Sequence, residues 1–130
     1  IQATLRDVGI DCRSRDDETT LLWEKLVFLA PVALATSAFA APLGGVRNDP
    51  SFAGCRDEAA AAAREAGATV DLDSIRSLHE AAPAEMQSSM QKDVAAGREP
   101  ELTAIAGPIL RRGGAESTEL LVDRIRARLD

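Results

Sequence analysis

The chain has 130 residues and a formal net charge of −6, and 45% of its residues are hydrophobic. This length and hydrophobic fraction suit one globular domain with a modest core and exclude an intrinsically disordered chain. Lys and Arg are scattered among a larger number of carboxylates, which argues against binding to nucleic acid.

Alanine and leucine dominate the apolar residues, whereas aromatic residues make up only 3% of the chain. Alanine and leucine lose little entropy in a helix, while strands favour the β-branched and aromatic residues that are scarce here. The composition therefore predicts an all-α fold.

The first part of the chain, residues 1–17, reads as the tail of one element followed by a linker. Residues 1–8 have a helical pattern ending at Gly9, residues 10–12 are short and extended in pattern, and a polar stretch follows. Because the chain opens on Ile1 in what reads as mid-element sequence, we interpret it as a fragment of a longer protein.

Residues 26–45 carry no charge and include an Ala-Phe-Ala step similar to a signal-peptidase site. The run follows an acidic stretch inside the chain instead of a basic N-terminus, so we reject a signal peptide. Alanines and prolines dilute it, so we also reject a membrane span. We expect a buried core helix instead, capped by Thr19 or Thr20, kinked at Pro31, and ended by Pro42 with the glycines at 44–45.

Four further helical segments follow, each with a start or stop signal in the sequence. Asp49 and Pro50 are an N-cap and a first helical residue, and Gly67, Pro83 and Gly97 are breaks. We predict helices over 51–65, 71–81 (starting at Asp71 or Asp73), 85–96 and 101–112. A last amphipathic helix is predicted from residues 117–119, with Leu120, Leu121, Ile125 and Leu129 on its apolar face.

Cys12 and Cys55 are the only cysteines, and His79 is the only histidine. One cysteine pair without metal-ligand spacing excludes a zinc site and a Cys/His nucleophile, so no metal is expected. We interpret both cysteines as reduced thiols of a cytoplasmic protein, with a disulfide between them as the alternative.

Lys25 is the most unusual charged residue, because its helical neighbours three and four positions away are all apolar. These neighbours are Leu21, Leu22, Phe28 and Leu29. Partial desolvation would disfavour the ammonium and let it give up a proton near neutral pH. In the alternative, its stem lies along the apolar face and its amine reaches water.

Three segments occur in a fixed order: Leu-Trp-Glu-Lys-Leu at 22–26, Ser-Ser-Met-Gln-Lys-Asp at 88–93, and Gly97-Arg98 with Glu101 and Ile-Ala-Gly at 105–107. Together they resemble the C-terminal domain of ketopantoate (2-dehydropantoate) reductases, over roughly residues 21–130. The resemblance implies an all-α domain of the 6-phosphogluconate dehydrogenase C-terminal-like type in residues 18–130. It also implies that residues 1–17 are a remnant of an N-terminal Rossmann domain and its linker. The rest of that domain, which binds NADPH in the family, would be missing, since the chain has no GxGxxG motif.

The resemblance also assigns roles to three residues. Lys25 takes the position of the general acid that protonates the ketone oxygen, Ser89 that of a substrate-contacting serine, and Glu101 that of a glutamate that positions cofactor and substrate. A desolvated lysine suits the first role.

The chain departs from the family at three positions where substrate-side asparagines are usual. Leu29 and Ala33 stand four and eight residues after the lysine, and Leu43 follows Pro42. Either this subgroup binds the same substrate differently, or it favours a bulkier, more apolar 2-oxo acid. Residues 112–118 also look several residues shorter than usual before the last helix.

We therefore predict the C-terminal half of an NADPH-dependent 2-oxo acid reductase, with 2-dehydropantoate (ketopantoate) reduction in coenzyme A biosynthesis as the leading activity. It would work with its own Rossmann domain, be inactive alone, and form homo-oligomers. The alternative is a helical dimerisation or interaction module without catalytic activity.

Overall fold

The computed structural model describes residues 15–98 and 100–129, and all regular structure in these residues is helical. The elements are α2 (Arg15–Phe39), α3 (Leu43–Val46), α4 (Pro50–Glu65), α5 (Leu72–Ala81), α6 (Ser89–Ala95), α7 (Leu102–Leu110) and α8 (Glu116–Leu129). The predicted all-α fold is confirmed. The predictions for residues 1–12, including the state of Cys12, lie outside the described residues.

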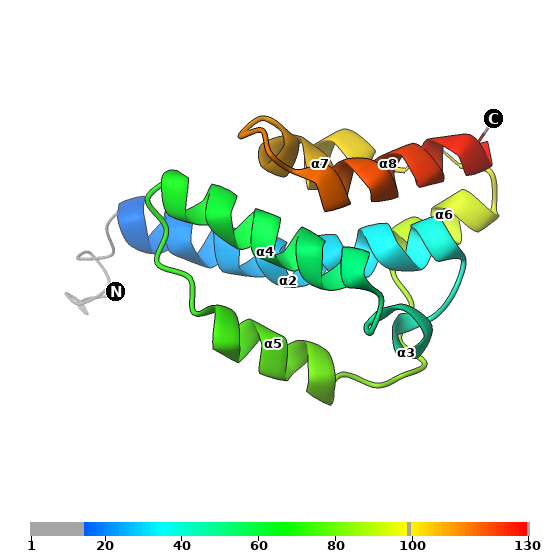
Figure 1. Cartoon of the computed structure of the whole chain (residues 1–130), viewed down its shortest axis with the longest axis horizontal. Helices are drawn as coiled ribbons and strands as arrows, with labels where there is room; N and C mark the ends of the chain where they lie inside the picture. The colour runs from blue at the N-terminus through cyan, green and yellow to red at the C-terminus, as the bar shows by residue number, and fades with distance from the viewer. Residues whose placement is uncertain (1–14, 99, 130) are drawn as a thin grey trace, which may run out of the picture.

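Helix α2 is the central element of the bundle (Figure 1). Helices α4, α6 and α8 pack against it, as do α3, α5 and α7, and residues 30–38 are all buried. By length and hydropathy, Glu18–Phe39 would also suffice to cross a membrane. The same composition suits the central helix of a bundle, and the prediction of a buried core helix is confirmed.

Both predicted ends of this helix need correction. In the described residues it already extends from Arg15, so neither Thr19 nor Thr20 is its cap. The Thr20 hydroxyl instead accepts a hydrogen bond from the amide of Thr69 (3.1 Å), which is a tertiary contact. The helix ends at Phe39, before the proline and glycines, where Ala40 adopts a left-handed conformation (φ 52°).

Two arginines of α8 bind the carboxyl end of α2. Arg124 Nε donates to the carbonyl of Ala38 (3.2 Å), and Arg128 donates to the carbonyl of Ser37. The Arg124 guanidinium also lies 4.5 Å from the centre of the Phe39 ring. Because the last carbonyls of a helix lack partners within it, these contacts tie the end of the chain to the central helix.

The predicted caps of α4 and α5 are confirmed. Asp49 accepts from the amide of Ser51 with Pro50 at the first helical position, and Asp71 accepts from the amide of Ser74 (3.2 Å). Gly67 and Gly97 follow α4 and α6 with positive φ angles of 92° and 76°.

Helix α3 packs against the segment that leads into α6. The amides of Leu43 and Gly44 donate to the carbonyls of Met86 (2.9 Å) and Ala84 (2.8 Å). Gly44 therefore lies inside a short helix and does not terminate α2. Residues 85–88, predicted as helix, are instead held in a loop by these bonds, so α6 begins at Ser89.

The amino end of α8 is capped from another helix. The Glu58 carboxylate of α4 accepts from the amides of Ser117 (2.9 Å) and Thr118 (2.8 Å) and from the Thr118 hydroxyl (2.7 Å). The helix begins at Glu116, close to the prediction. Its predicted apolar face is half wrong: two of the four residues are exposed, Leu120 at 53% and Leu129 at 36%.

Candidate functional site

A pocket of about 540 Å³ lies between α2, the segment that enters α6, and the start of α7. Helix α2 contributes Phe28, Leu29, Val32 and Ala33 to it. The remaining lining residues are Met86, Gln87, Ser88, Ser89, Met90, Asp93, Glu101 and Ile105. Two predicted site residues, Ser89 and Glu101, thus line one pocket, together with two of the positions that depart from the family pattern.

Ser89 is held at the pocket by the residue before it. The Ser88 hydroxyl caps α6 by accepting from the amide of Gln91 (2.9 Å), and it lies 2.8 Å from the buried hydroxyl of Thr36 on α2. This arrangement makes Ser89 the first residue of α6 and leaves its side chain exposed at the pocket.

Glu101 reaches the pocket from the N-cap position of α7. Its side chain makes no capping hydrogen bond, and it is exposed. The connection from α6 is shaped by Asp93, whose carbonyl accepts from the amide of Arg98 (2.8 Å) and whose carboxylate pairs with the Arg98 guanidinium (3.0 Å). Because no capping bond engages it within the part of the chain that the structure describes, the Glu101 carboxylate can accept hydrogen bonds from a ligand.

Lys25 is exposed on α2, as in the alternative in which its amine reaches water, and it is not desolvated by the described residues. It lies one turn before Leu29 on the same helix stripe, but it does not line the pocket. Leu21 and Leu22 beside it are also exposed, at 47% and 70%. Among residues 15–98 and 100–129, no element covers this face enough to remove Lys25 from water.

Leu43 corrects an expectation. It is fully buried in the core at the start of α3 and does not line the pocket. Of the three positions expected on the substrate side, only Leu29 and Ala33 face the pocket, because the bonds between α3 and residues 84–86 turn Leu43 inward.

Residues 18–122 match the family model described as the C-terminal domain of PanE/ApbA ketopantoate reductases. The chain belongs to this family. No curated protein matches the chain.

Two solved ketopantoate reductases resemble the chain, and each match covers 85% of this chain. One is the PanE/ApbA family ketopantoate reductase of Ralstonia eutropha JMP134, with 24% identity and a TM-score of 0.73. The other is the dimeric ketopantoate reductase of Staphylococcus aureus, with 20% identity and a TM-score of 0.74. At these identities the likeness establishes the fold. The chain covers 41% and 43% of the two relatives, so it spans less than half of either.

The charges at the pocket of this ketopantoate reductase domain are acidic. Asp93 and Glu101 line it, and no Lys or Arg is among its lining residues in the described part of the chain. Cationic side chains are the groups that bind phosphates most strongly. The lining offers none of them to the phosphates of a dinucleotide, whereas Glu101 can accept from a sugar hydroxyl or an amide.

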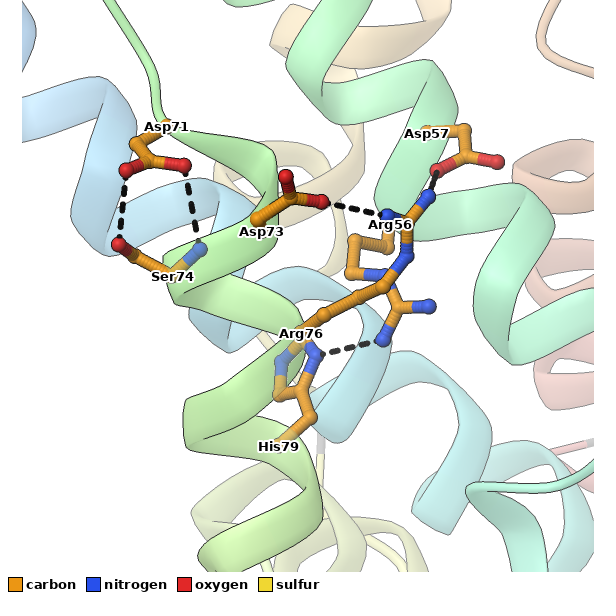
Figure 2. Close-up of polar contacts among 7 residues, drawn as sticks. All are labelled: Arg56, Asp57, Asp71, Asp73, Ser74, Arg76 and His79. Atoms are coloured by element: carbon orange, nitrogen blue, oxygen red, sulfur yellow. Dashed lines mark hydrogen bonds and ion pairs between the residues drawn. The ribbon is translucent and has the colours of Figure 1, made fainter.

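A buried contact between His79 of α5 and Arg56 of α4 (Figure 2) is joined to α2 through the backbone of Phe28. His79 is 1% exposed and lies between the rings of Phe28 and Phe52, with centroid distances of 4.8 and 4.9 Å. Its Nδ1 lies 3.2 Å from Arg56 Nη1, and its Nε2 lies 2.9 Å from the carbonyl oxygen of Phe28.

These partners fix the protonation state of His79. A guanidinium only donates, so Nδ1 accepts, and a carbonyl only accepts, so Nε2 carries the hydrogen. Burial lowers the pKa of His79, the Phe28 carbonyl opposes this shift, and the Arg56 charge adds to it. The neutral imidazole thus links three helices, a role that the sequence did not indicate for its one histidine.

Cys55 is a free, fully buried thiol on α4. Burial is the main cause that raises its pKa to about 12. A thiol that stays protonated is a poor nucleophile, so Cys55 acts as a core residue.

Proposed function

We propose that the chain is the helical half of an NADPH-dependent reductase of a 2-oxo acid such as ketopantoate. Residues 18–130 would form this domain, and residues 1–17, of which 15–17 continue into the first turn of α2, would belong to the nucleotide-binding domain and its linker. The observation that carries the proposal is the shared pocket, where Ser89 and Glu101 meet the α2 stripe that begins at Lys25.

Lys25 would act as the general acid. A bound NADPH would supply the hydride to the carbonyl carbon. As that carbon is reduced, Lys25 Nζ would donate a proton to the carbonyl oxygen, which yields the 2-hydroxy acid, and the amine would regain its proton from water. A nucleotide-binding domain packed on this face would cover Lys25 together with the exposed Leu22, and desolvation would then favour proton release.

Ser89 and Glu101 would bind the reactants. The Ser89 hydroxyl can donate to a substrate oxygen, and the Glu101 carboxylate can accept from a substrate or cofactor hydroxyl. The acidic lining supports a division of labour in which a separate Rossmann domain holds the cofactor phosphates. The dimeric S. aureus relative and the exposed leucines support a homo-oligomer.

The chain offers a matched pair of variants for the test, because Lys25 and Lys92 are its only lysines. Lys92 is exposed on α6 and does not line the pocket. In the protein that joins this domain to its nucleotide-binding domain, Lys25→Met should lower kcat by about 10²-fold or more, as expected for loss of a general acid. Lys92→Met should leave kcat within about twofold, a change too small to report a lost catalytic group.

An interaction module without chemistry is the competing function, and the exposed Leu21 and Leu22 favour it. It predicts equal turnover for both lysine variants. A second measurement is calorimetry of the 130-residue chain with NADPH. We expect negligible affinity, since no cationic side chain lines the pocket to bind the phosphates, and a Kd in the low micromolar range would contradict the proposed division of labour.

A further inference from the structure

We propose that the substrate is a 2-oxo acid with a hydrocarbon side chain, packed against an apolar wall that α2 presents to the pocket. This inference rests on the proposed function and adds the substrate class to it.

The apolar wall consists of Phe28, Leu29, Val32 and Ala33, and no other residue of α2 lines the pocket. Leu29 is 38% exposed, so a large apolar side chain is open to solvent at the pocket. Met86 and Ile105 extend the apolar lining from the neighbouring elements. Covering such a surface with a hydrocarbon group is favourable in proportion to the apolar area removed from water.

The polar groups of the pocket all come from residues 87–101. Two of them are already engaged, since the Ser88 hydroxyl bonds Thr36 and Gln91, and Asp93 pairs with Arg98. Gln87, Ser89 and Glu101 remain. The Ser89 hydroxyl can donate to the oxo acid end of a substrate, and the Glu101 carboxylate can accept from a cofactor hydroxyl.

A substrate hydroxyl directed at α2 would meet only carbon atoms. The Thr36 hydroxyl, one turn beyond Val32 on α2, is fully buried and already bonds the Val32 carbonyl (2.6 Å). A buried hydroxyl without a partner loses its bonds to water, so the wall should disfavour a hydroxylated side chain.

Two probes differ by this one hydroxyl. One is 2-dehydropantoate, which is 4-hydroxy-3,3-dimethyl-2-oxobutanoate, and the other is 3,3-dimethyl-2-oxobutanoate. In the protein that includes the nucleotide-binding domain, we expect kcat/KM to favour the probe without the hydroxyl by about 10-fold or more. A larger ratio than about 10²-fold is not expected, because apolar pockets reject an added hydroxyl only moderately.

Variants of the wall test the cause of this preference. Leu29→Asn supplies a hydrogen-bonding group at a partly exposed position, so the fold should tolerate it, and the ratio should shift towards 2-dehydropantoate by about 10-fold or more. Ala33→Ser adds a smaller polar group to the wall, so the ratio should shift towards 2-dehydropantoate to a smaller extent. Leu78→Asn on α5, 56% exposed and away from the pocket, should leave the ratio unchanged.

The outcomes separate this inference from the proposed function. Preference of the unmodified protein for 2-dehydropantoate, or an unchanged ratio in Leu29→Asn and Ala33→Ser, overturns the hydrocarbon substrate and leaves a reductase in place. If the protein reduces neither probe, nor any other 2-oxo acid, with NADPH, both the hydrocarbon substrate and the proposed reductase function are overturned.

Discussion

The hydroxyl of Thr36 lies 2.8 Å from the hydroxyl of Ser88. The other hydrogen-bond partners of these two hydroxyls determine which of them is the donor. Thr36 donates to the carbonyl of Val32 (2.6 Å), so Ser88 donates to Thr36 and accepts from the amide of Gln91 (2.9 Å). This chain of bonds joins the middle of α2 to the cap that sets Ser89 at the pocket.

Thr36→Val should therefore destabilise the domain, since it leaves the Ser88 hydroxyl without its acceptor at a part-buried site. We expect a loss of about 1–3 kcal/mol in the free energy of unfolding, measured by urea denaturation. Thr36→Ser keeps the hydroxyl and is the control. An equal loss in both variants would show that packing of the methyl group matters and the hydrogen bond does not.

Stability should depend on pH through His79. Its pKa is lowered in the folded chain from the ordinary value of 6.5, so the folded state binds fewer protons than the unfolded state. The stabilising contribution of neutral His79 is complete above pH 6.5 and is lost as the pH falls below that value, with a slope of at most about 1.4 kcal/mol per pH unit.

Denaturation curves of the unmodified chain and of His79→Gln between pH 7.5 and 5.5 test this contribution. The slope of unfolding free energy against pH should be smaller in His79→Gln, which does not titrate, while the carboxylates contribute equally to both proteins. Identical slopes would mean that His79 titrates normally despite its burial.

Substitution of Glu58 should destabilise the bundle more than substitution of most other carboxylates, because Glu58 caps a helix that is remote in sequence. Glu58→Ala leaves two amides and the Thr118 hydroxyl without their acceptor, so we expect a loss of about 2–3 kcal/mol in unfolding free energy. Glu58→Gln keeps an acceptor and should lose less. Arg64→Ala, at an exposed site on the same helix, should stay within about 0.5 kcal/mol, and a comparable loss there would point to a general effect of α4.

Gly44 should not tolerate a side chain. A Cβ at this position would lie 2.7 Å from the Ala84 Cβ and 3.1 Å from the Ala84 carbonyl oxygen, in a contact closed by a backbone hydrogen bond. Gly44→Ala should lower unfolding free energy by about 1–3 kcal/mol through overpacking. Gly45→Ala, whose Cβ would meet Ala41 Cβ at 3.2 Å, should cost less.

The double variant Gly44→Ala/Ala84→Gly removes the closer of the two clashes and should recover part of the lost stability. Absence of any recovery would place the strain in the α3 backbone instead of in the contact with Ala84.

The sequence by itself predicted the helical content, the caps at Asp49 and Asp71, and the breaks at Gly67 and Gly97. These features depend on residues a few positions apart, where the backbone alone determines which side chain can accept an amide or adopt a positive φ angle. The order of short segments around Lys25, Ser89 and Glu101 also sufficed for the family, which the match over residues 18–122 confirmed.

Only the tertiary structure decided where α6 begins, how α8 is capped, and which apolar residues face the pocket. Each of these depends on a partner far along the chain: Leu43 with Met86, Glu58 with Thr118, and Thr36 with Ser88. Lys25 shows the same limit, because its apolar helical neighbours left open whether its amine is partly desolvated or reaches water, and its exposure depends on which other elements cover that face. Helix periodicity identifies the residues on one stripe, but only packing determines what lies opposite them.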